Sequence, residues 1–144
     1  MARARVLLAE DHAPVAAQLR ALLEQEFDVV ATVADGRTLV SMAEAMRPDV
    51  VVTDIAMPGL DGLAATTVLR DRHAEMPVIL ITVHDDHEVV RAGFEAGALG
   101  YVLKQDAPDH LLTAIHLALR GERYTSRPPE DAAGPRRGDA ETAT

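Results

Sequence analysis

The chain of 144 residues contains no cysteine and no tryptophan. Without cysteine it can form neither a disulfide bond nor a metal site with thiolate ligands. No apolar stretch approaches the ~18 residues that a membrane-spanning helix needs, and the N-terminus shows no signal-peptide pattern. We therefore expect a cytoplasmic protein with one domain, because this length allows a single sizeable hydrophobic core.

Basic residues are also scarce. Lysine and arginine together number 14 against 23 acidic residues, which gives a net charge of −9. Such a surface argues against binding to nucleic acid, which requires a basic patch, and against binding to anionic membranes. Lys104 is the only lysine in the chain. We attribute the rarity of lysine to genomic composition, so the position of this one residue carries more information than the shortage.

Short apolar runs alternate with amphipathic stretches along the chain. The apolar runs are typical of buried strands, and they cover residues 6–9, 29–33, 50–53, 78–82 and 101–103. The amphipathic stretches have helical spacing, and they cover residues 14–23, 39–46, 62–73, 87–96 and 111–119. Five strand–helix units in succession predict an α/β domain with a parallel sheet and helices on both of its faces.

The third of these helices is expected to begin after Asp61, whose side chain can cap its first turn. We expect three of its residues to face the core: Leu63, Thr67 and Val68.

The composition changes after Tyr124. The segment that follows is rich in proline and glycine and contains almost no large apolar residue. Such a segment cannot bury enough surface to offset the entropy of the chain. We therefore predict a domain over residues 1–123, followed by a disordered tail or linker remnant over residues 124–144.

Polar residues that could carry chemistry follow the apolar runs. Glu10 and Asp11 come after the first strand, Asp54 ends the third, Thr82 ends the fourth and Lys104 follows the fifth. The carboxyl ends of parallel strands meet at one edge of a sheet, which is where open α/β sheets bind their ligands. The sequence therefore predicts that three acids and one amine lie close together.

Clustered carboxylates repel each other unless a hard cation lies between them. Magnesium prefers oxygen ligands and usually keeps several waters. We expect Asp11 and Asp54 to bind it directly, with the backbone carbonyl of Ala56, and Glu10 to act through a water. Asp54 is also the better candidate for a nucleophile that attacks phosphorus, because the turn after it is expected to leave its outer oxygen facing solvent.

Lys104 would then neutralise phosphoryl oxygens as a point charge, and Thr82 would donate a hydroxyl hydrogen bond to them.

These residues resemble the receiver domain of bacterial two-component response regulators. The resemblance rests on Glu10-Asp11, on the string from Asp54 to Gly62, and on Thr82 and Lys104. The strings at residues 81–86 and 100–104 are similar to the NarL/FixJ subfamily, whose longer members carry a LuxR-type helix-turn-helix. The similarity extends over roughly residues 4 to 121.

The resemblance implies a doubly wound, flavodoxin-like (βα)5 domain with a five-stranded sheet in the order 2-1-3-4-5. It implies a phosphoprotein rather than an enzyme, in which a sensor histidine kinase transfers phosphate to Asp54 with Mg²⁺. Thr82 and Tyr101 match the pair that moves on phosphorylation. Tyr101 is expected to rotate into the core, changing the face made by the fourth helix, fifth strand and fifth helix for a partner.

Two residues depart from the family's common pattern. Gln105 follows the lysine where proline is frequent, and Val83 follows Thr82 where a small residue is common, so that it could narrow access to Asp54. Ala56 and His84 match positions that tune the lifetime of the phosphorylated state in the family.

Other readings of the sequence stay open. A pseudo-receiver would bind partners without phosphate, although the acid cluster and Lys104 argue against it. A phosphatase of the haloacid dehalogenase type would need a second aspartate at the position of Ala56. The sequence leaves open an unknown downstream protein or a missing C-terminal output domain. It leaves open also a monomer or a weak homodimer through the first and fifth helices or the switch face.

Overall fold

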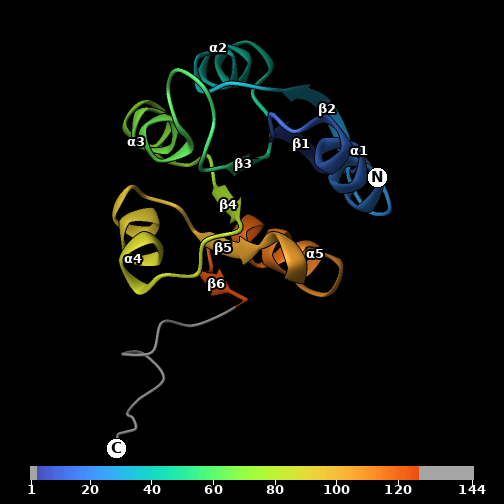
Figure 1. The fold of residues 1–144 in the computed structure, drawn as a ribbon. Coiled ribbons are helices and arrows are strands. Elements are labelled where there is room, and N and C mark those ends of the chain that lie inside the picture. Colours follow the sequence, from blue (N-terminus) through green and yellow to red (C-terminus); the bar gives the residue numbers. More distant parts are fainter. Residues whose placement is uncertain (1–2, 127–144) are drawn as a thin grey trace, which may run out of the picture.

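A computed structural model describes residues 3–126 of the chain. Within this range strands and helices alternate (Figure 1). The strands are β1 (Arg5–Ala9), β2 (Asp28–Val33), β3 (Val50–Asp54), β4 (Val78–Thr82), β5 (Gly100–Leu103) and β6 (Tyr124–Thr125). The helices are α1 (Ala13–Leu23), α2 (Gly36–Met46), α3 (Gly62–Arg72), α4 (His87–Glu95) and α5 (Ala107–Leu119), and a 3-10 turn covers Lys104–Asp106.

All strands of the sheet are parallel, and their order is β2-β1-β3-β4-β5-β6. This confirms the predicted doubly wound α/β fold and the order of the first five strands. The structure adds one strand that the sequence analysis did not predict. In β6, Tyr124 lies opposite Gly100 and Thr125 opposite Tyr101, although the sequence assigned both to the segment after the domain. The tail predicted over the remaining residues 127–144 lies outside the described residues.

Helices cover both faces of the sheet, so its central strands are apolar until they reach their polar carboxyl ends. All five residues of β3 and all five of β4 are buried. One face packs against α1 and α5 through residues that include Leu19, Leu111 and Ile115. The other face packs against α2, α3 and α4 (Figure 1). The carboxyl ends of the strands therefore form one rim between two layers of helices.

The third helix begins where the sequence predicts, but it faces the core differently. Asp61 caps it, since its Oδ1 accepts a hydrogen bond from the amide of Ala64 at 2.8 Å. Thr67 was predicted to face the core and is exposed, while Thr66 is fully buried. Thr66 tolerates burial because its hydroxyl donates to the carbonyl of Gly62 at 2.7 Å, and a buried polar group needs such a partner.

A glycine lets this helix approach the end of β3. A Cβ atom at Gly62 would lie 2.0 Å from the carbonyl oxygen of Asp54, a distance that no side chain can occupy. The amide of Gly62 also donates to the carbonyl of Ile55 at 2.8 Å. The backbone around Asp54 is thus held by direct contact with the first turn of α3.

In the part of the chain that the structure describes, the helices are too short or too polar for any of them to cross a bilayer.

Candidate functional site

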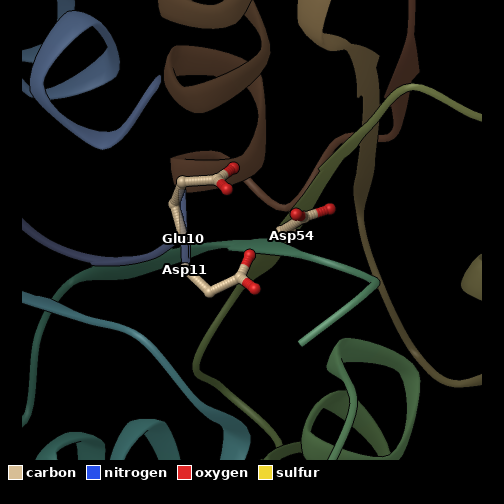
Figure 2. Close-up of side chains that lie close together, drawn as sticks. All are labelled: Glu10, Asp11 and Asp54. Atoms are coloured by element: carbon tan, nitrogen blue, oxygen red, sulfur yellow. The ribbon is translucent and has the colours of Figure 1, made fainter. Parts of the chain in front are cut away.

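Three carboxylates gather at the carboxyl ends of β1 and β3. Oxygen atoms of Glu10, Asp11 and Asp54 lie within 4.8 Å of one another, and Figure 2 shows the three side chains side by side at these strand ends. Glu10 is 2% exposed and Asp54 is 5% exposed, whereas Asp11 is open to solvent. The structure therefore brings together the three acids that the sequence predicted at one rim.

The sheet itself positions the two residues after β1. The amide of Glu10 donates to the carbonyl of Val33 at 2.9 Å, which continues the pairing of β1 with β2 by one residue. The amide of His12 donates to Glu10 Oε2 at 3.0 Å. The carboxylate of Glu10 is thereby turned back over the strand end, and Asp11 is left to point outward from the turn.

Lys104 reaches the cluster from the end of β5. Its Nζ lies 2.9 Å from Asp54 Oδ2 and 2.7 Å from Glu10 Oε1. The contact with Asp54 is the proximity that the sequence predicted. The sequence predicted that Glu10 also lies nearby but not that it pairs with Lys104, because strand order places residues at an edge and does not say how far a side chain reaches. The one signal for this ion pair in the sequence was that a single lysine is expected beside three acids.

Glu10 and Asp54 keep the amine of Lys104 protonated. Burial alone would lower the pKa of Lys104, but the contacts with Glu10 and Asp54 outweigh it, and the pKa lies above its ordinary value. Lys104 is therefore a fixed positive charge at neutral pH. It balances part of the negative charge of the cluster.

Both oxygens of Asp54 have partners. Oδ1 accepts a hydrogen bond from the amide of Ile55 at 2.7 Å, and Oδ2 faces Lys104. The side chain is only 7% exposed. The outer oxygen thus faces the amine rather than open solvent, contrary to the expectation from the turn that follows it. A ligand would reach Asp54 from the side of the cluster, where Asp11 is exposed.

The donor set fits a hard divalent cation. All three groups offer carboxylate oxygens, and magnesium is bound in proteins through a few such oxygens with waters completing its shell. Glu10 Oε1 is buried and has Lys104 Nζ at 2.7 Å as its partner, while the same ammonium group also faces Asp54. The cluster therefore holds more negative charge than one ammonium group neutralises.

Thr82 and Tyr101 are linked through the backbone of His84. Thr82 is fully buried at the end of β4, and its hydroxyl accepts a hydrogen bond from the amide of His84 at 3.3 Å. The hydroxyl of Tyr101 donates to the carbonyl of His84 at 2.5 Å. Tyr101 is 1% exposed, so its ring occupies the inward position that the sequence analysis expected it to reach by rotation.

Burial raises the pKa of the Tyr101 hydroxyl well above its ordinary value, and the nearby charges of Asp86 and Asp85 raise it further. The group is therefore a neutral hydrogen-bond donor across the physiological pH range.

Ala56 and His84, the two positions expected to tune lifetime, both have exposed side chains. Val83 is 67% exposed and lines a groove that also contains Lys104, Val15 of α1 and Pro108 of α5. Val83 thus borders the approach to the site on the side of α1 and α5.

Comparison with known proteins gives one consistent family. The family model of the response regulator receiver domain matches residues 6–116. The transcriptional regulatory protein DegU of Brevibacillus brevis is 34% identical over 122 residues, which cover 83% of this chain and 52% of that protein. The chain therefore spans about half the length of such curated relatives.

Solved structures agree. A LuxR-family two-component response regulator from Aurantimonas sp. SI85-9A1 superposes with a TM-score of 0.83 at 35% identity, covering 87% of this chain and 91% of that one. The signal receiver domain of a NarL response regulator from Mycobacterium tuberculosis superposes with a TM-score of 0.80 at 27% identity, covering 85% of this chain and all of that one.

Proposed function

The chain belongs to the response regulator receiver domain family, and we propose that Asp54 is its phosphoryl acceptor, with a sensor histidine kinase as the donor. The observation that carries this proposal is the position of Lys104, whose Nζ contacts both Asp54 Oδ2 and Glu10 Oε1. An amine held at the nucleophile by two acids is placed to receive a phosphoryl oxygen.

The proposed transfer needs no proton from Asp54. An oxygen of its ionised carboxylate bonds to phosphorus while the bond from phosphorus to the kinase histidine nitrogen breaks. The electron pair of that bond leaves with the imidazole, which takes up a proton. Lys104, which is charged at neutral pH, balances the negative charge that arrives on the phosphoryl oxygens. Such a site would act in the cytoplasm, where a kinase forms its phosphohistidine from ATP.

Glu10, Asp11 and Asp54 are the residues that would hold magnesium, with the carbonyl of Ala56 as a further proposed ligand and Glu10 acting through a water. A bound Mg²⁺ would neutralise charge shared between the carboxylates and the phosphoryl oxygens. The exposed position of Asp11 supports this, because it leaves one carboxylate free of the Lys104 contacts that engage the other two.

Thr82 is the proposed donor of a hydroxyl hydrogen bond to the phosphoryl group. Its hydroxyl lies at the end of β4 and accepts from His84, so its own hydrogen is available to an acceptor at the site. Movement of Thr82 and of the His84 backbone would act on Tyr101, whose hydroxyl bonds to the same residue. The face of α4, β5 and α5 would then change shape for a downstream partner or a covalently linked output domain.

A phosphatase is the weaker proposal. An exposed alanine, Ala56, occupies the position where that reaction would need its general acid. We propose instead that the chain assists only its own phosphorylation and dephosphorylation. Ala56 and His84 are the residues proposed to tune the lifetime of the phosphorylated state. A monomer or a weak homodimer is part of the proposal, as is the absence of bound nucleic acid on a chain with a net charge of −9.

The proposal is tested by incubating the chain with acetyl phosphate and magnesium and measuring its intact mass. We expect a gain of one phosphoryl group in the wild type and none in Asp54→Asn. Asp61→Asn is the matched control, since Asp61 lies on the same loop but caps α3, and it should be phosphorylated like the wild type.

Absence of an adduct in the wild type, under conditions where a known receiver domain is phosphorylated, would favour the pseudo-receiver. Sustained release of phosphate from a model ester, proportional to protein and lost in Asp54→Asn, would favour the phosphatase.

A further inference from the structure

The segment Arg123–Ser126 runs along the outer edge of β5, between α4 and α5 (Figure 1). Two backbone hydrogen bonds hold it there. The amide of Tyr124 donates to the carbonyl of Leu99, and the amide of Ser126 donates to the carbonyl of Tyr101, both at 3.0 Å. The segment therefore occupies the edge that β5 would otherwise leave open, and one of its two bonds goes to Tyr101.

Side chains extend this contact in both directions. The amide of Leu103 donates to Ser126 Oγ at 3.1 Å. The guanidinium of Arg123 lies over the ring of Phe94 on α4, at 4.6 Å from its centroid, a favourable cation–π contact. The hydroxyl of Tyr124 is hydrogen-bonded to Nδ1 of His110 on α5. The segment thus contacts one residue or more of each of the three elements α4, β5 and α5.

The ring of Tyr101 packs against α4, where a glycine makes room for it. A Cβ atom at Gly93 would lie 3.3 Å from Tyr101 Cδ2 and 2.7 Å from Leu80 Cδ1, closer than such atoms normally approach. The Tyr101 and Phe94 rings have their centroids 6.4 Å apart. Phe94 is thus paired with Tyr101 through its ring and with Arg123 through the cation–π contact.

The inward ring and the bound segment occur together in this structure, linked through Phe94 and through the hydrogen bond from Ser126 to the Tyr101 carbonyl. We infer that Arg123–Ser126 is the chain's own ligand for the α4–β5–α5 face, and that its docking is coupled to the inward position of Tyr101. The inference rests on the proposed function only in one respect: phosphorylation of Asp54 would favour the inward ring and tighten the segment.

Two consequences follow from this coupling. A partner that needs the same face must displace residues 123–126, so its affinity is reduced by the free energy of docking. The state of the switch is also passed directly to whatever follows Ser126, because the strand that leaves the domain is paired with the residue that moves. Coupling of this kind is reciprocal, so weakening the segment must also weaken the inward state.

The first arm of the test uses no phosphate. Amide hydrogen exchange of Tyr124 and Ser126 is measured by NMR in the 144-residue chain. Gly93→Ala should push the ring outward and speed exchange at Ser126 about tenfold. Tyr101→Phe keeps the ring but removes the bond to His84, and it should speed the same exchange by a smaller factor.

The control for this arm is Glu95→Ala, a substitution at an exposed position of α4, which should leave exchange at Ser126 unchanged. Exchange at Val52 in the centre of β3 reports whether each variant keeps the fold, because a loss of global stability would speed both amides together.

The second arm tests reciprocity with beryllofluoride and magnesium. Binding should slow exchange at Ser126 in the wild type, and Arg123→Ala should weaken the apparent affinity for beryllofluoride by a few-fold. Arg120→Ala is the matched control, since Arg120 pairs with Glu122 on the surface and should leave the affinity unchanged.

The inference is overturned if Gly93→Ala and Tyr101→Phe both leave the exchange rate of the Ser126 amide equal to that of the wild type, whatever happens at Asp54. If beryllofluoride does not shift the NMR signals of the amides around Asp54, the proposed function is contradicted instead. The first arm would still decide whether the segment and the ring are coupled.

Discussion

The strands start at one edge of the sheet and end at the other, and these amino-terminal and carboxyl edges use charged residues in different ways. At the amino-terminal edge, Nη1 of Arg5 donates to the carbonyls of Met46 and Arg47 at the end of α2, at 2.8 and 2.9 Å. The amide of Arg5 donates to Asp49 Oδ2 at 2.8 Å. These charged side chains bond to backbone groups that a helix end and a strand start leave without partners. Their charge serves the fold.

At the carboxyl edge the charges face one another. Lys104 contacts Glu10 and Asp54, and Asp11 adds a third carboxylate to the same cluster. Like charges held this close cost stability, and sequences retain such conflicts at functional sites. The charges that meet backbone groups serve the fold, whereas the crowded carboxylates around Lys104 form the proposed functional site.

The largest expected difference between the two edges comes from removing one cation from each. Lys104→Met should slow phosphorylation of Asp54 by acetyl phosphate about 100-fold, because a preorganised charge at the transferred group is lost. Arg5→Met should leave this rate unchanged and lower the free energy of unfolding by about 1–2 kcal/mol, the cost of hydrogen bonds lost at the helix end.

Rates come from the time course of the intact-mass adduct, and stabilities from urea unfolding. Arg5→Lys serves as the control for charge alone, since lysine keeps the charge but lacks the two-pronged guanidinium. A slow phosphorylation in Arg5→Met would mean that the two edges are not independent.

Removing the acid Asp11 should raise the stability of the protein while it weakens the binding of magnesium. Asp11→Asn lowers the repulsion in the cluster and should raise the stability of the metal-free protein by about 0.5 kcal/mol. The same change removes a proposed ligand and should weaken magnesium binding about tenfold. Calorimetric titration with magnesium measures the affinity. A variant that loses both affinity and stability would contradict the view that this acid is held for a ligand.

Periodicity of apolar residues predicted which polar residues would lie close together, because each buried run ends where polar residues begin. Asp54 and Lys104 lie 50 residues apart, yet parallel strand order alone brings their strand ends to one edge. The ion pair of Lys104 with Glu10 could not be predicted in this way, since it depends on the reach of a flexible side chain and on the turn that directs Glu10 back over β1.

Two other features lay outside what a pattern can show. Helix α3 has few large apolar residues, so its inward face was misjudged, with Thr67 predicted inward where Thr66 is buried. Strand β6 has two residues, too few for any alternation to be visible. It is a strand only because the edge of β5 offers carbonyls and amides to pair with, which is a property of the sheet and not of the segment.

Alkaline pH should lower the stability of the chain through two groups on and directly after β5. The pKa values of Tyr101 and Lys104 are both raised in the folded chain. Below about pH 10 both groups keep their protons in either state, and their contribution to stability is fully present. As pH rises further, the unfolded chain releases these protons first, so the free energy of unfolding falls.

Urea unfolding over roughly pH 9 to 11 measures this dependence. Tyr101→Phe and Lys104→Met should each flatten part of the fall, and the double variant should flatten more of it than either. A double variant with the full wild-type slope would place the titrating groups elsewhere.

The smallest expected effect is the matched counterpart of Asp54→Asn at the opposite edge. Asp49 Oδ2 accepts from the amide of Arg5, and an asparagine carbonyl can accept the same bond. Asp49→Asn should therefore change neither phosphorylation nor the free energy of unfolding by a measurable amount, whereas Asp49→Ala should lower the latter by about 0.5–1 kcal/mol. Asparagine replaces aspartate where only the position of an acceptor matters. At Asp54 the same exchange removes the proposed nucleophile, so one isosteric substitution made at each end of the sheet tests whether a carboxylate is structural or reactive.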